Sequence, residues 1–116
     1  MNRFVNFSNH SSEKWDGNQR EEALKYGMIQ DIPFPAVDPD GDEAYIDRLA
    51  ELCTAQIEGF SPRAVLCQGE FCLAYQVTAR LKEKGILVLA ACSERVVKED
   101  GHKKEVSFTF RRFRRY

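Results

Sequence analysis

This chain of 116 residues has no long apolar run and no cysteines at CxxC spacing, and it has only two histidines. No apolar stretch approaches the roughly 20 residues that a membrane-spanning helix requires. The N-terminal segment MNRFVNFSNH also lacks the apolar core and small-residue cleavage site of a signal peptide. We therefore predict a cytoplasmic protein that has no membrane segment.

The cysteine pattern argues against a zinc site and against disulfides. The four cysteines are scattered through apolar segments, and none of them is part of a CxxC motif. This pattern predicts buried free thiols. Neither a Ser/His/Asp order nor a metal-ligand spacing is present, so we expect no metal and no cofactor. The cysteines are Cys53, Cys67, Cys72 and Cys92.

The composition is that of an ordinary globular domain. Hydrophobic residues make up 43% of the chain, aromatic residues 11% and charged residues 30%. A chain of this length forms one core, so we expect a single domain spanning residues 1–116. The net charge of −1 does not indicate long nucleic acid or a membrane surface as a partner. However, the last six residues contain four arginines, at positions 111, 112, 114 and 115.

Residues 64–95 carry the clearest structural pattern. Ala64–Cys67 is a short apolar run typical of a buried strand, and Phe71–Lys84 has apolar residues at helical spacing before Gly85. Ile86–Cys92 is a second apolar strand that we expect to end at Ser93. Together they predict a right-handed strand–helix–strand unit with polar clusters at the carboxyl ends of its strands. Ligands bind at this edge in open α/β sheets.

The rest of the chain extends this unit into an α/β fold. We predict a Rossmann-like, mostly parallel sheet with a C-terminal antiparallel hairpin at one edge. The further predicted elements are strands at Arg3–Phe7 and Met28–Ile32, helices at Gln19–Tyr26 and Glu43–Glu58, and hairpin arms at Val96–Val97 and Val106–Phe113.

Three polar clusters follow predicted strands and are candidate binding loops. The first, residues 6–12, is either a phosphate- or ribose-binding loop or a solvated turn with a helix cap. Its His10 is better placed for acid–base chemistry than His102, which lies in the hairpin turn. The second cluster, residues 68–71, combines a glycine turn with a helix start, where the carboxylate of Glu70 also has a sufficient structural role. The third is Ser93–Arg95.

The C-terminal FRRFRRY segment interleaves aromatic residues with arginines. This composition suits stacking and phosphate contacts at a nucleotide site. It equally suits an edge strand that is protected by charge and has Phe110 packed inward. We leave both interpretations open.

The blocks QGEF, GILVLAACSERVV and KKEVSFTFRRFRRY, with the opening segment FSNH, are similar to a known family. In order and spacing they resemble the small Csx-type CRISPR-associated proteins, most closely the kind numbered twenty. The resemblance covers roughly the first dozen and the last fifty residues.

The resemblance implies a CARF-like dimer that binds cyclic oligoadenylate, the second messenger of type III CRISPR defence. Because 116 residues leave no room for an effector domain, it favours a ring nuclease that degrades the messenger, with cyclic tetra-adenylate as the expected ring. Each ribose 2′-OH would attack its adjacent phosphate in line, without a metal. The alternatives are a non-catalytic sensor or sponge for the same messenger, or an unrelated Rossmann-like protein without a nucleotide ligand. A homodimer is expected because two copies match a symmetric ring.

The predicted site residues fall into two groups. For catalysis we select His10, Ser11 and Arg95. For ligand binding we select Asn6, Ser8, Asn9, Gln68, Gly69, Glu70, Phe71, Ser93 and Glu94.

Overall fold

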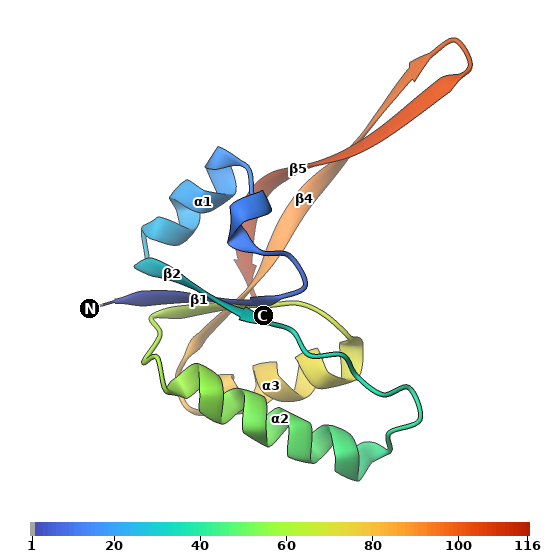
Figure 1. Ribbon diagram of the computed structural model, residues 1–116. Helices are drawn as coiled ribbons and strands as arrows, with labels where there is room; N and C mark the ends of the chain where they lie inside the picture. Colours follow the sequence, from blue (N-terminus) through green and yellow to red (C-terminus); the bar gives the residue numbers. More distant parts are fainter. Residues whose placement is uncertain (1) are drawn as a thin grey trace.

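The computed structural model describes residues 2–116, which form an α/β fold (Figure 1). Strands and helices alternate until the last two strands, which are joined directly as a hairpin. In chain order the elements are β1 (Arg3–Ser8), the short 3-10 helix η1 (Ser12–Lys14), α1 (Gly17–Leu24), β2 (Met28–Pro33), α2 (Glu43–Glu58), β3 (Ala64–Cys67), α3 (Phe71–Glu83), β4 (Leu87–Asp100) and β5 (Lys103–Arg115).

The strands form one mixed sheet in the order β2-β1-β3-β4-β5. The first three neighbouring pairs are parallel, and β4 pairs with β5 in antiparallel orientation. This arrangement confirms the predicted mostly parallel sheet with a C-terminal hairpin. From β1 the chain moves outward to β2 and then returns to β3 on the other side of β1. The carboxyl ends of β1 and β3 therefore flank the point where the strand order reverses, which is where open α/β sheets bind ligands.

Helices cover both faces of the sheet (Figure 1). Along β1, Phe4 belongs to the core on the α1 side, whereas Val5 and Phe7 belong to the core beneath α2 and α3. Burial on both faces explains why β3 is apolar throughout, whereas β1 is buried at five of its six positions and includes the buried polar residues Asn6 and Ser8. The smaller core on the α1 side also packs against Trp15 and Phe113, which come from opposite ends of the chain.

Side-chain caps decide where the helices begin. Asp42 accepts a hydrogen bond from the Tyr45 N–H at 2.9 Å, and α2 spans the predicted Glu43–Glu58. Asp16 caps α1 through the Gln19 N–H at 2.9 Å, so this helix begins two residues earlier than we predicted. In the DGN sequence at residues 16–18, Asp16 is therefore the N-cap, and Gly17 and Asn18 are the first two helical residues. Among residues 2–116, no helix is both long and apolar enough to cross a membrane.

The hairpin corrects our prediction for residues 86–97. Strand β4 runs from Leu87 to Asp100 without a break, so the polar residues at 93–95 lie inside a strand and not after its end. Pairing with β5 satisfies the backbone of these residues without apolar side chains. Cys92 pairs with Arg112 while Ser93 pairs with Phe110, which leaves Arg111 as an extra residue in a bulge. Beyond the bulge the two strands project from the body of the molecule (Figure 1).

All four cysteines are free thiols, as predicted, but their burial differs. Cys53 and Cys67 are buried, whereas Cys92 is half-buried and Cys72 is exposed, so burial was wrongly predicted for Cys72. Burial raises the pKa of the Cys67 thiol from 9.0 to about 11.

Candidate functional site

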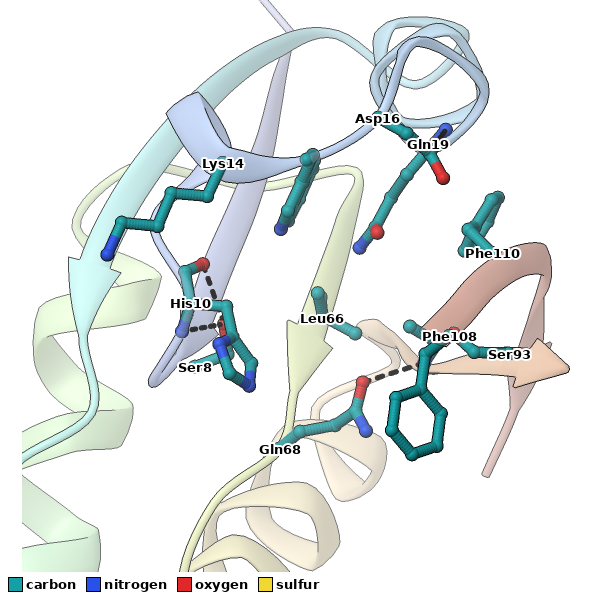
Figure 2. Close-up of a pocket in the computed structure, with 12 residues that line it drawn as sticks. Ser8, His10, Lys14, Asp16, Gln19, Leu66, Gln68, Ser93, Phe108 and Phe110 are labelled. Carbon is teal, nitrogen blue, oxygen red and sulfur yellow. Dashed lines mark hydrogen bonds between the residues drawn. The ribbon is translucent and has the colours of Figure 1, made fainter. Parts of the chain in front are cut away.

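A cleft of about 460 Å³ opens on the α1 side of the sheet, beside the carboxyl ends of β1 and β3 (Figure 2). Four parts of the chain contribute to it: the loop after β1, the η1–α1 segment, the end of β3 and the hairpin. Its lining residues are Ser8, His10, Lys14, Trp15, Asp16, Gln19, Leu66, Gln68, Ala91, Ser93, Phe108 and Phe110.

His10 is held in the cleft by its backbone. The hydroxyl of Ser8 donates to Asn6 Oδ1 at 2.7 Å and accepts from the His10 N–H at 3.2 Å. Asn6 Nδ2 donates to the His10 carbonyl at 2.8 Å. Both Asn6 and Ser8 are buried, whereas His10 is exposed. The loop is thus fixed from inside the protein, and the imidazole remains available to a ligand.

Asp31 of β2 completes this support, although our sequence analysis did not select it. It lies opposite Asn6 in the parallel register. Its carboxylate accepts from Asn6 Nδ2 at 2.9 Å, from Ser12 Oγ at 2.9 Å and from the Ser12 N–H at 3.3 Å. One side chain thereby joins β1, β2 and η1. The available signal was a polar residue at the same position in two neighbouring, otherwise largely apolar strands.

Gln68 follows the end of β3, and its side chain accepts a hydrogen bond from β4 where β3 no longer provides a backbone acceptor. The pairing of β3 with β4 ends at Leu89, so the Ala91 N–H has no backbone partner from β3. Gln68 Oε1 accepts that hydrogen bond at 2.8 Å. Because only the oxygen of a carboxamide accepts, this bond fixes the amide orientation and leaves Nε2 as a donor for the cleft (Figure 2).

Of the predicted site residues, four line the cleft: Ser8, His10, Gln68 and Ser93. Asn6, Asn9 and Ser11 instead border a smaller hollow of about 260 Å³, which Ser8 shares, together with Asp31. Ser11 is the N-cap of η1, and its hydroxyl accepts from the Glu13 N–H at 3.4 Å. The loop after β1 therefore separates two hollows.

The QGEF turn has a largely structural role in this fold. Glu70 caps α3 by accepting from the N–H groups of Cys72 and Leu73 at 2.5 and 3.2 Å. Gly69 lies outside the cleft, and a Cβ atom there would be 2.6 Å from the buried ring of Phe34. Core packing against Phe34 thus gives the glycine a structural role. Gly69 and Phe71 line a separate hollow of about 410 Å³, which Gln68 and Tyr116 also border. Phe71 also lies outside the cleft and is 90% exposed.

Glu94 and Arg95 lie on the projecting hairpin and do not line the cleft. Glu94 is exposed and forms an ion pair with Arg111 at 3.6 Å. Arg95 is exposed and pairs across the hairpin with Phe108. The strand continues through both residues, so they do not meet at the sheet edge as we predicted.

Lys14 also lines the cleft, but Figure 2 shows its ammonium group pointing away from Gln19, Gln68 and Phe108. We did not select Lys14 or the other residues that complete the walls of the cleft. Those other lining residues are Trp15, Asp16, Gln19, Leu66, Ala91, Phe108 and Phe110. The aromatic members lie about ninety residues apart in the sequence and meet only because β5 returns along the sheet. Within residues 2–116, no group of three or more His, Cys, Asp or Glu side chains is arranged to hold a metal ion together. Aromatic surfaces, a fixed amide donor and an imidazole suit a planar ligand that carries acceptor oxygens.

Comparison with curated proteins and with solved structures found no match to this chain. A family model, described as the uncharacterized protein MJ1673 family, matches residues 2–114. This match extends over nearly the whole chain, from β1 to the last residues of β5. The chain therefore belongs to the MJ1673 family.

Proposed function

We propose that the protein is a ring nuclease that binds cyclic oligoadenylate in the cleft and cleaves it. The observation that carries the proposal is the convergence of a fixed histidine loop and a fixed amide donor at the point where the strand order reverses. The type III CRISPR context and the CARF-like relationship are inferred from the sequence resemblance. The strand order, with β1 between β2 and β3, is the order of flavodoxin-like doubly wound sheets and supports a Rossmann-like classification.

The proposed reaction is an in-line transfer within the bound ring. The ribose 2′-oxygen forms a bond to the adjacent phosphorus while the bond from phosphorus to the 5′-oxygen breaks. The 2′-OH proton leaves and the 5′-oxygen gains one, so the products are a 2′,3′-cyclic phosphate and a 5′-OH. In this scheme His10 transfers the proton, and the Gln68 amide donates a hydrogen bond to the phosphate.

The size of the cleft supports a two-copy site. Its volume of about 460 Å³ is within the roughly 300–1,000 Å³ typical of small-molecule pockets, whereas cyclic tetra-adenylate contains four nucleotides. We infer that one protomer contacts part of the ring, and that a second protomer related by a two-fold axis contacts the rest. Light scattering with and without the ring measures this directly.

Binding without cleavage is the second candidate, and the placement of Arg95 favours it. Arg95, which we selected for catalysis, lies outside the cleft, on the hairpin. A sensor or sponge needs the binding surfaces of the cleft but no proton transfer.

The test is incubation with cyclic tri-, tetra- and hexa-adenylate in the presence of EDTA, followed by chromatography of the products. We expect linear products from the unchanged protein. For His10→Ala we expect a 10²- to 10⁴-fold lower single-turnover rate with little loss of binding, the usual range for a general acid or base. His102→Ala is the matched control, since this exposed histidine lies in the hairpin turn. Retention of the intact ring supports the sponge, and a full rate in His10→Ala removes His10 from the mechanism.

A further inference from the structure

Phe108 is an exposed aromatic side chain on the wall of the cleft. It is 69% exposed, whereas Phe110, two residues along the same strand, is 5% exposed and packs against Phe113. Phe110 is therefore explained by the core, but Phe108 contributes little to it. An aromatic ring that borders a polar cleft provides a surface on which a planar ligand stacks.

Two carboxamides lie in the same cleft as this ring. Gln19 uses its backbone N–H for the α1 cap, and within residues 2–116 its half-buried side chain makes no hydrogen bond. Gln68 has its oxygen engaged by Ala91 and offers only Nε2. Figure 2 shows Gln19, Gln68 and Phe108 reaching the cleft from three separate elements. The cleft thus combines an apolar surface with one amide of free orientation and one of fixed orientation.

We infer that Phe108, Gln19 and Gln68 form a nucleobase subsite, which takes adenine if the proposed function is correct. The base stacks on Phe108, as bases do on exposed aromatic side chains in sites for single-stranded nucleic acid. A carboxamide pairs with the N6 donor and N7 acceptor of adenine through two hydrogen bonds, and Gln19 has both its groups free for this. Gln68 Nε2 donates to an acceptor on the base or on its ribose.

A competing role for Phe108 is contact with another protein through the hairpin. Val97 and Val106 are 38% and 43% exposed and lie on the same face of the hairpin as Phe108, since alternate residues of a strand share a face. In that role, truncation of Val106 would have the same kind of effect as truncation of Phe108. Only Phe108 lines the cleft, so the two variants separate the two roles.

The experiment follows the indole N–H signal of Trp15 by nuclear magnetic resonance. Trp15 is the only tryptophan of the chain and lines the cleft, so this signal is assigned without further work. Adenosine 5′-monophosphate and ribose 5-phosphate are titrated separately to millimolar concentration. Ribose 5-phosphate has an anomeric hydroxyl where the nucleotide has adenine, so the difference between their affinities reports mainly the base subsite.

We expect Phe108→Ala to weaken binding of adenosine 5′-monophosphate by roughly 5- to 150-fold and to leave binding of ribose 5-phosphate unchanged. Phe108→Tyr, which keeps the ring, retains binding, and Gln19→Leu weakens binding of the nucleotide alone. Val106→Ala is the matched control and binds both probes like the unchanged protein. The inference is overturned if the two probes bind equally, if adenosine 5′-monophosphate does not bind, or if Val106→Ala and Phe108→Ala lose the same affinity.

This result does not depend on catalysis. The probes are not cyclic and are not turned over, so absence of ring cleavage removes the proposed enzyme activity and leaves the base subsite standing. Conversely, if the unchanged protein cleaves the ring and Phe108→Ala binds adenosine 5′-monophosphate with unchanged affinity, the subsite is refuted and the proposed activity is not.

Discussion

The carboxylate of Asp31 gives the sharpest stability prediction. It accepts hydrogen bonds from Asn6 Nδ2, Ser12 Oγ and the Ser12 N–H, and both donor residues are buried. In Asp31→Ala these donors lose their acceptor within a site that is largely closed to water. Asn6 keeps its second bond, to the His10 carbonyl, so only one of its two amide hydrogens loses its partner.

The magnitude follows from those bonds. A hydrogen bond to a charged group contributes about 1.5–3 kcal/mol, and an unsatisfied buried donor costs about 1–3 kcal/mol. Asp31 is partly exposed and water replaces it for some of the donors, so we expect a loss of about 2–4 kcal/mol in the free energy of unfolding. Asp31→Asn keeps one acceptor oxygen, but its amide group faces the Ser12 donors. For this variant we expect a loss of about 1–2 kcal/mol.

The assay is guanidinium unfolding followed by the fluorescence of Trp15, with linear extrapolation to water. Asp40→Ala is the matched control, since Asp40 is exposed and its side chain makes no hydrogen bond or ion pair within residues 2–116. We expect this control to change stability by less than about 0.5 kcal/mol. A loss below about 1 kcal/mol for Asp31→Ala would refute the reasoning, because the buried donors would then have other partners.

Two further predictions concern packing and pH. Gly69→Ala should lower the free energy of unfolding by about 1–3 kcal/mol, because the new Cβ atom would lie 2.6 Å from the ring of Phe34. A Cβ atom at Gly17 meets no atom within 4 Å, so Gly17→Ala should leave the free energy of unfolding nearly unchanged in the same assay. Unaltered stability of Gly69→Ala would contradict the packing argument. Burial raises the pKa of Cys67 from 9.0 to about 11. Between these two pH values the folded state retains a proton that the unfolded state has lost. The free energy of unfolding therefore decreases as pH rises from about 9 to about 11. Burial also raises the pKa of Tyr116, which acts in the same direction. Unfolding measured across this range should show a shallower pH dependence in Cys67→Ala, and an identical slope would exclude the thiol as a cause.

Elements with apolar periodicity were predictable from the sequence. The bounds of β3 and α2 were predicted correctly. A strand that is buried on both faces is apolar throughout, and a helix that is buried along one stripe has apolar residues at helical spacing. The length of β4 was not predictable in this way. Its outer half is exposed and polar, and it is a strand only because β5 pairs with it along its whole length.

The candidate site was predictable mainly near the ends of β1 and β3, and Ser93 was also selected although it lies inside β4. His10 lies two residues after the end of β1, and Gln68 lies one residue after the end of β3, so the rule that ligands bind at strand ends located them. Gln19 and Phe108 reach the cleft from a helix and from the hairpin, and their meeting depends on tertiary packing that has no local signature. Asn6 was selected as a ligand contact, but in this fold its amide is used to hold the histidine loop.

The neighbouring strands β3 and β4 differ greatly in length, and this difference leaves room for the cleft. β3 has four residues and β4 has fourteen, so the cleft occupies space beside β4 into which a longer β3 would have extended. The side-chain oxygen of Gln68, rather than a backbone carbonyl of β3, accepts the hydrogen bond from the Ala91 N–H. Lengthening β3 by two residues would bring its backbone to the Ala91 N–H and fill the cavity, while the layers below it keep their packing. The shape of the cleft and the packing of the core are therefore separately adjustable, and we expect an insertion after Cys67 to narrow the cleft.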